Sequence, residues 1–133
     1  MSGDSPLTDA KILAVDDELL IVLDVEMSVR EAGAAVIWSC STVDEAMKIA
    51  AKEDITAAVL DVRIGPGTSE PVAQQLRERG IPFLFYSGQD LPPAMAARFP
   101  LAPMLKKPLR PDGLIEALLY LILRSAENRT KAV

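Results

Sequence analysis

A run of small and branched apolar residues, Ala57–Leu60, ends abruptly at a carboxylate, Asp61. A run of this length, between Thr56 and the turn signal Gly65-Pro66-Gly67, is typical of a strand buried on both faces of a sheet. Asp61 is then expected where the buried strand leaves the core. Because an ionised carboxylate without a partner is costly to desolvate, an acid at this place indicates a bound cation or a reaction.

Five apolar runs of this kind alternate with helical patterns along the chain. The expected strands are Lys11–Val15, Ala34–Trp38, Ala57–Asp61, Pro82–Tyr86 and Leu101–Leu105, and the expected helices are Leu19–Ala32, Val43–Ala51, Ser69–Arg79, Pro92–Phe99 and Pro111 to about Ser125. Such alternation predicts an α/β fold, in which a doubly wound five-stranded parallel sheet has helices on both faces. The expected strand order is 2-1-3-4-5, which makes a flavodoxin-like three-layer sandwich.

Length and charge narrow the range of partners. The chain has 133 residues, of which 50% are hydrophobic, and this suits one domain, expected over residues 10–126 between an N-terminal tail (1–9) and a C-terminal tail (127–133). With 14 basic and 19 acidic residues and no basic cluster beyond Lys106-Lys107, the chain is a poor electrostatic match for nucleic acid or an anionic membrane. We expect a cytoplasmic protein, because the sequence shows neither a signal peptide nor a membrane span.

Two residue types restrict the chemistry. Cys40 is the single cysteine, and its place after an apolar run predicts a buried packing thiol. Histidine is absent, which excludes a histidine base, a histidine metal ligand or a phosphohistidine within this chain.

Polar residues follow four of the five expected strands. They are Asp16-Asp17 after the first strand, Asp61 at the end of the third, Ser87-Gly88 after the fourth and Lys106-Lys107-Pro108 after the fifth. Right-handed crossovers bring these strand ends to one edge, where parallel sheets bind ligands. Converging carboxylates call for a divalent cation, and an all-oxygen site suits magnesium or manganese. Asp61 is the natural nucleophile toward a phosphoryl group, because it lies between the acid pair and the Ser87 and Lys107 donors.

These segments resemble the response-regulator receiver domain of two-component signalling. The resemblance is carried by Ile12–Glu18, Val59–Val62, Tyr86–Gly88 and Lys107-Pro108, and it extends over about residues 10–126. It implies a phosphorelay protein rather than an enzyme. Its phosphoryl donor would be a sensor histidine kinase or a histidine phosphotransfer protein, and its output partner is a protein that the sequence does not identify.

The resemblance also implies a role for each site residue. Asp61 is the phospho-acceptor, while Asp16 and Asp17 bind Mg2+, Asp17 directly and Asp16 largely through water. The backbone carbonyl of Arg63 completes the metal shell. Ser87 would bond a phosphoryl oxygen, and Lys107 would pair with the phosphoryl group, with its peptide bond to Pro108 in the cis form.

Simpler roles exist for these polar residues. Asp16 or Asp17 can cap the helix that begins at Leu19, Ser87-Gly88 can be a plain turn, and Lys106-Lys107 can be a solvated pair. At the level of function, the first reading is a phosphorylated stand-alone switch or phosphoryl shuttle, since no further domain fits before Val133. The alternative is a receiver-shaped interaction module that works without phosphorylation. An aspartate-nucleophile hydrolase is disfavoured, because such enzymes need a second Asp where Arg63 stands.

Two apolar stripes exceed what a surface helix needs to bury. In the first helix, Leu19, Leu20, Leu23 and Met27 are expected to dock the phosphoryl donor, and the alternative is that they pack inside the domain. In the last helix, apolar residues from Leu114 to Leu123 cover an arc of roughly 200°, which indicates a homodimer or an output contact. Met104 stands where receivers often carry an aromatic switch residue, and the helix at Pro92–Phe99 is short, so output is expected to depart from the usual pattern.

Overall fold

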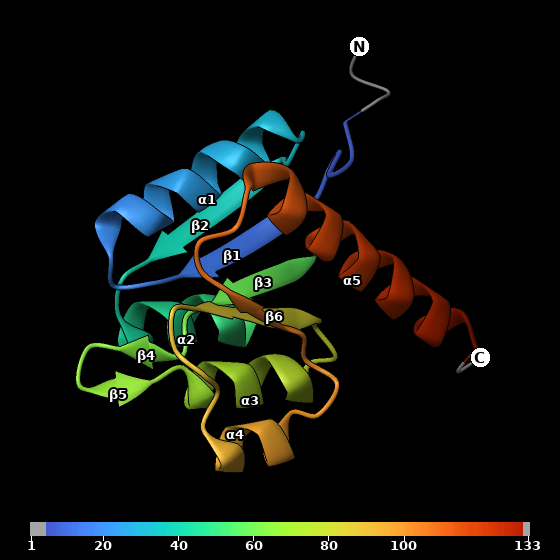
Figure 1. Cartoon of the computed structure of the whole chain (residues 1–133). Coiled ribbons are helices and arrows are strands. Elements are labelled where there is room, and N and C mark those ends of the chain that lie inside the picture. Colours follow the sequence, from blue (N-terminus) through green and yellow to red (C-terminus); the bar gives the residue numbers. More distant parts are fainter. Residues whose placement is uncertain (1–4, 132–133) are drawn as a thin grey trace.

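The computed structural model describes residues 5–131 and has a five-stranded parallel sheet between two layers of helices (Figure 1). The sheet strands are β1 (Lys11–Val15), β2 (Val36–Cys40), β3 (Ala57–Leu60), β6 (Phe83–Ser87) and β7 (Met104–Lys106). The helices are α1 (Leu19–Glu31), α2 (Val43–Lys52), α3 (Glu70–Glu78), α4 (Pro93–Arg98) and α5 (Pro111–Lys131). The order β2-β1-β3-β6-β7 confirms the predicted flavodoxin-like sheet.

The central strand β3 contributes side chains to both faces of the sheet. Ala58 and Leu60 belong to the core under α2, α3 and α4, whereas Ala57 and Val59 belong to the core under α1 and α5. This follows from the two-residue period of a strand. Figure 1 shows the same division, with α1 and α5 on one face and the other three helices on the opposite face. The expectation of a strand buried on both sides is therefore confirmed.

The parallel register brings the carboxyl ends of the strands to one edge. Val15 pairs with Leu60, and the amide of the next residue, Asp61, donates to the Val15 carbonyl at 2.9 Å. In the strands on the other side of β3, Ser87 of β6 pairs with Lys106 of β7, and the Lys107 amide donates to the Ser87 carbonyl at 2.9 Å. The residues that follow β1, β3, β6 and β7 are thus neighbours in space.

The segment between β3 and α3 differs from the prediction. It folds into an antiparallel pair, β4 (Arg63–Ile64) and β5 (Gly67–Thr68), where the sequence indicated only a turn. Gly65 has φ 59°, a left-handed conformation that glycine adopts without strain and that lets the chain reverse in two residues. The fifth sheet strand was expected at Leu101–Leu105 but begins only at Met104, because Leu101 and Ala102 lie in a turn after α4.

Both predicted tails are in part structured. Helix α5 runs to Lys131 rather than to about Ser125, since the residues after Ser125 include good helix formers such as Ala, Glu and Lys. At the other end Leu7 is 1% exposed, and its amide donates to the Ala32 carbonyl at 2.8 Å. Residues 1–4 and 132–133 of the two predicted tails lie outside the described residues. Among the described helices, none combines the length and the apolar character that a membrane crossing requires.

Candidate functional site

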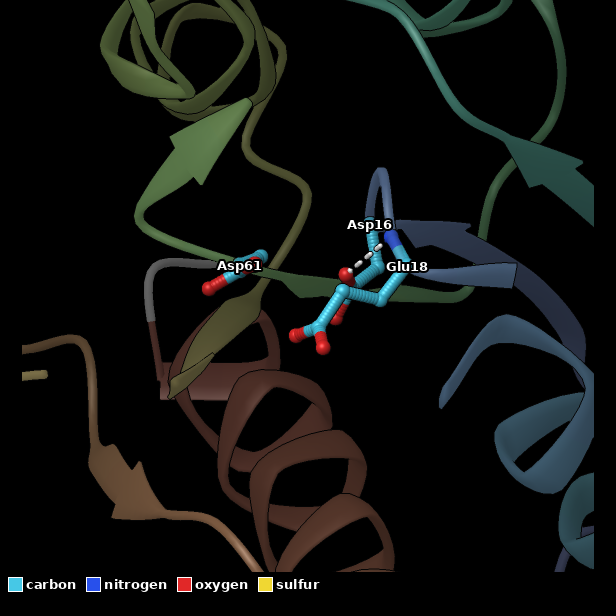
Figure 2. A group of neighbouring side chains, drawn as sticks. All are labelled: Asp16, Glu18 and Asp61. Carbon is cyan, nitrogen blue, oxygen red and sulfur yellow. Dashed lines mark hydrogen bonds between the residues drawn. The ribbon is translucent and has the colours of Figure 1, made fainter. Parts of the chain in front are cut away.

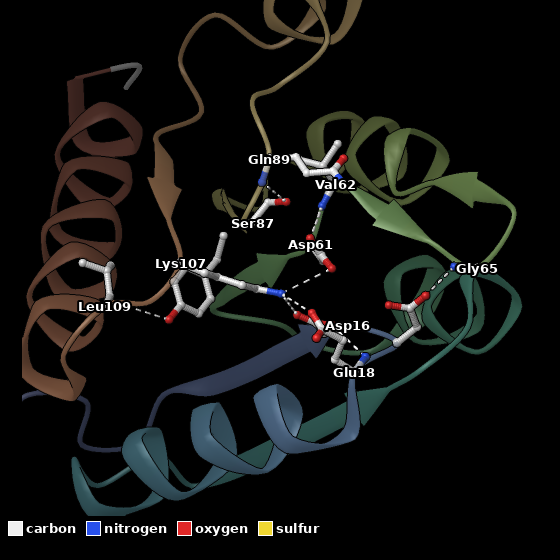
Figure 3. A network of polar contacts seen from close by, with 11 residues as sticks. Asp16, Glu18, Asp61, Val62, Gly65, Ser87, Gln89, Lys107 and Leu109 are labelled. Atoms are coloured by element: carbon white, nitrogen blue, oxygen red, sulfur yellow. Dashed lines mark hydrogen bonds and ion pairs between the residues drawn. The ribbon is translucent and has the colours of Figure 1, made fainter.

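Asp61 lies directly after β3, at the carboxyl edge of the sheet, and is 7% exposed. Its Oδ1 accepts a hydrogen bond from the Val62 amide at 2.8 Å, and its Oδ2 lies 3.4 Å from Lys107 Nζ (Figure 3). The first contact leaves Oδ2 directed toward the lysine and the acids that follow β1. Oδ1 of Asp61 is therefore held by the backbone, whereas Oδ2 faces the lysine.

Three carboxylates gather at this point. Asp16, Glu18 and Asp61 each offer an oxygen, and these oxygens lie within 4.8 Å of one another (Figure 2). The Glu18 amide donates to Asp16 Oδ1 at 2.9 Å, which turns the chain after β1 so that both side chains reach the same space. Asp16 is buried and Glu18 is exposed, so the cluster opens to solvent on the Glu18 side.

Lys107, the residue directly after β7, joins the cluster. Its Nζ lies 2.7 Å from Asp16 Oδ2 and 3.2 Å from Glu18 Oε1, and its side chain is only 10% exposed. The Nζ atom also lies 5.8 Å from the centre of the Tyr86 ring, a ring whose hydroxyl accepts from the Leu109 amide at 3.0 Å. The Lys107-Pro108 peptide bond is cis, as predicted. Figure 3 shows the lysine reaching across the sheet edge to the acids.

The charges of the cluster are not balanced. Burial raises the pKa of Asp16 from 3.8 to about 6, and the charge of Asp61 adds to this rise, against hydrogen bonds from Lys107 and the Glu18 amide. Burial acts to lower the pKa of Lys107, but the hydrogen bond and ion pair with Asp16 outweigh it and the pKa is raised. Lys107 therefore stays protonated, and one ammonium group faces three carboxylates.

Asp17 and Arg63 lie beside the cluster rather than in it. Asp17 Oδ2 accepts a hydrogen bond from the Gly65 amide at 2.7 Å and so ties the end of β1 to the β4–β5 hairpin. Arg63 begins β4, and its Nε donates to Gln89 Oε1 at 3.2 Å. Their predicted roles at the metal stay predictions. The sequence assigns no separate role to Glu18, and its place in the run of three acids after β1 is the signal that points to it.

Ser87 ends β6 and is 3% exposed. Its Oγ accepts a hydrogen bond from the Gln89 amide at 3.3 Å, a contact typical of a turn. Met104 is half-buried at the start of β7 and pairs with Phe85. Ser87 thus shares the sheet edge with Asp61 and Lys107, while Met104 lies at the other end of its strand.

The donor set of the cluster fits magnesium. Its ligand atoms are all carboxylate oxygens, which a small hard divalent cation prefers, and the described side chains leave two negative charges in excess when all three acids are ionised. Burial is the main cause of the raised pKa of Asp16, and repulsion from Asp61 adds to it. Asp61 at this point can also act as a nucleophile, with Lys107 beside it to meet a developing negative charge.

Known proteins resemble this chain in structure but not detectably in sequence. The sequence matches no protein-family model and no curated protein. The structure does match solved structures. A CheY-like receiver domain protein from Methanospirillum hungatei has a TM-score of 0.81 at 15% identity, over 90% of this chain and 98% of the other. A response regulator receiver protein from Sinorhizobium medicae has a TM-score of 0.77 at 27% identity, over 87% and 96%. CheY4 of Vibrio cholerae has 0.75 at 24% identity, over 86% and 99%.

Proposed function

With response-regulator receiver domains as its structural neighbours, we propose that this chain is a phospho-accepting receiver of a two-component phosphorelay. Asp61 takes a phosphoryl group from a phosphohistidine of a sensor histidine kinase or a histidine phosphotransfer protein. The observation that supports this most strongly is the Asp16, Glu18 and Asp61 cluster with Lys107 inserted in it.

The transfer is a substitution at phosphorus. Oδ2 of Asp61 forms a bond to phosphorus while the phosphorus–nitrogen bond of the donor breaks, and the electron pair of that bond stays on the imidazole nitrogen. The Val62 amide keeps Oδ1 of Asp61 in place during the attack, because it already donates to that oxygen. The product is an acyl phosphate on Asp61.

A divalent cation completes this site. We assign Mg2+ to Asp16 and Asp61, joined by Asp17 and the Arg63 carbonyl as in the resembled family. Glu18 is a further oxygen donor within reach of the same point. When bound, magnesium supplies positive charge to the phosphoryl oxygens. The chain needs this charge, since Lys107 alone does not balance its carboxylates.

Lys107 and Ser87 are the two residues proposed to respond when Asp61 carries a phosphoryl group. The ammonium group of Lys107 is held by three carboxylates before transfer, and a phosphoryl group on Asp61 competes for it with a higher charge. Among the described residues, the Gln89 amide at 3.3 Å is the one hydrogen-bond partner of Ser87 Oγ, and Oγ accepts in that bond. Its hydroxyl proton can therefore turn to a phosphoryl oxygen. Movement of these two side chains would pass the signal to β6 and β7.

The exposed side of α1 is the surface we propose for the phosphoryl donor. Leu20 is 75% exposed and Leu19 is 70% exposed, with Leu23 and Met27 on the same side of the helix. This apolar stripe begins next to the acids that follow β1. A donor helix packed there would bury apolar area and hold its histidine near Asp61.

The competing function is an interaction module that never carries a phosphoryl group. Beryllofluoride, a phosphoryl mimic, separates the two, and the receiver domain DrrB, a structural neighbour with a TM-score of 0.68, is described as activated by it. A phospho-acceptor should bind beryllofluoride only with Mg2+ and show amide shifts at Asp61, Ser87 and Lys107 by NMR. An unchanged spectrum with both reagents present would favour the interaction module.

A further inference from the structure

A groove of about 620 Å3 lies at the opposite end of the sheet from the acid cluster. It is bounded by the C-terminal half of α5 and by the segments that lead into β6 and β7. Phe83, at the start of β6, lines the groove, and Ser87, at the end of the same strand, lies beside the acid cluster. Ser87 is four residue steps along the strand from Phe83, a distance of about 13 Å, so the groove is distinct from the proposed phosphorylation site.

The groove is positive although the chain is acidic. Arg77, Arg98 and Arg124 line it, and none of the described residues that line it is an acid, in a chain of formal net charge -5. Among the ion pairs of the described residues, Arg98 has one with Glu70 from outside the groove, and neither Arg77 nor Arg124 takes part in one. An acidic ligand would therefore be repelled by most of the surface and attracted here.

Two of these guanidinium groups are held by groups that bear no charge. Arg77 donates to the Arg98 carbonyl and to the Gln74 side chain, and Arg124 donates to the Tyr120 hydroxyl at 2.8 Å. This hydrogen bond raises the pKa of Arg124, and the charge of Glu127 acts in the same direction. Each arginine is thus positioned by a neutral partner and keeps donors that a carboxylate can use.

The groove also offers apolar surface. The Phe99 ring lies under the guanidinium groups of Arg77 and Arg98, at 4.9 and 5.4 Å from the ring centre. On the rim, Leu101 is 88% exposed and Tyr120 is 58% exposed. Arginine and tyrosine beside exposed leucine are typical of protein interfaces, whereas a small-molecule site encloses most of its ligand.

We propose that this groove binds an acidic peptide segment of a partner protein. Carboxylates of the segment pair with Arg77 and Arg124, and a bulky apolar side chain between them packs on the exposed side chains of Leu101 and Tyr120. Planar guanidinium groups suit carboxylates because the two can form paired hydrogen bonds. The inference does not depend on phosphorylation, so its test uses the unphosphorylated chain.

The probe is a fluorescein-labelled synthetic peptide with acidic residues on both sides of a Trp-Leu pair. One comparison peptide has Lys for each acid, and another has Ser for Trp and Leu. Fluorescence anisotropy should show saturable binding of the acidic apolar peptide and at least tenfold weaker binding of both comparison peptides. Backbone NMR shifts should gather at Phe83, Leu101 and Tyr120. No binding of the acidic peptide up to millimolar concentration would overturn the proposal.

Two variants locate the binding on exposed residues, where folding is not at risk. Arg124→Glu should lower the affinity for the acidic peptide at least tenfold, and Leu101→Ser should lower it several-fold. The matched control is Arg30→Glu, an exposed arginine on α1 far from the groove, which should leave the affinity unchanged. An Arg124→Glu variant that binds as well as the original chain would overturn the proposal. So would N-acetylglutamate binding as tightly as the peptide, since that would indicate a small-anion site.

Discussion

Lys107 Nζ lies 2.7 Å from Asp16 Oδ2, across 91 residues of sequence, and both side chains are at least nine-tenths buried. This contact joins the residue that follows β1 to the residue that follows β7, at the carboxyl edge of the sheet. It also couples two events in the proposed cycle, because a cation at Asp16 and a phosphoryl group on Asp61 each compete with it. The first prediction tests this coupling.

Lys107→Ala should destabilise the chain without Mg2+ by about 1–3 kcal/mol, because it leaves buried carboxylates without their positive partner. Saturating Mg2+ should restore much of this loss, and the affinity for Mg2+ should not fall, since the lysine meets the phosphoryl group rather than the metal. Urea unfolding with and without Mg2+ measures both quantities. Lys106→Ala is the matched control, because the Lys106–Asp90 ion pair is exposed and its loss should cost less than about 1 kcal/mol. A weaker Mg2+ affinity in Lys107→Ala would contradict the assigned role.

The second prediction concerns the donor surface on α1. Leu23→Glu should slow phosphoryl transfer from a histidine kinase, found by screening a panel of phosphorylated kinases, and should spare labelling by acetyl phosphate. The reason is that Leu23 is 43% exposed on the surface proposed for the donor and does not belong to the acid cluster. Val36→Glu, which places the same charge on an exposed apolar residue at the start of β2, should leave both reactions unchanged. Equal damage to both reactions by Leu23→Glu would indicate a structural role instead.

A third prediction follows from α5. Leu114 and Leu118 are buried against the sheet, whereas Tyr120 and Leu123 remain more than half exposed, so part of the apolar arc is free for a contact. We expect a dimer in sedimentation experiments that beryllofluoride strengthens and that Leu123→Lys or Tyr120→Glu abolishes. A chain that stays monomeric with and without beryllofluoride would exclude the dimer and leave a heterologous output partner.

Cys40 provides a fourth prediction. It is 5% exposed, and burial raises the pKa of its thiol from 9.0 to about 11, with the charge of Glu45 adding to the rise. The reactive thiolate is therefore scarcer in the folded chain than in the unfolded chain at any pH below about 9, by on the order of a hundredfold. Iodoacetamide at pH 8 should label the folded chain far more slowly than the chain in urea. Equal rates would show that Cys40 is accessible.

The sequence predicted best where the physical signal is local. The alternation of apolar runs and helices predicted the sheet. The Ala57–Leu60 run predicted its central strand because a short apolar run between turn signals suits a strand covered on both faces. The position of Asp61, Ser87 and Lys107 at one edge of the sheet then followed, because parallel strands end at the same edge.

Features that depend on loop conformation could not be predicted from the sequence. Which of Asp16, Asp17 and Glu18 turns toward Asp61 depends on the backbone after β1, and the structure brings in Glu18 and directs Asp17 to Gly65. The burial of Leu7 depends on a contact with Ala32 far along the chain, which no local pattern records. The groove lined by Arg77, Arg98 and Arg124 is assembled from α3, α4, α5 and two loops. Its positive charge therefore cannot be predicted from a sequence with a net excess of acids.

The central claim is that Asp61 accepts a phosphoryl group with the help of Mg2+, and radiolabelled acetyl phosphate tests it most directly. The original chain should gain one label that hydroxylamine removes, as it removes an acyl phosphate, and chelation of Mg2+ should prevent labelling. Asp44→Asn, which changes an exposed acid on α2, should label normally. Asp61→Asn should gain no label, because an amide oxygen is a poor nucleophile. Undiminished, hydroxylamine-sensitive labelling of Asp61→Asn would contradict the account.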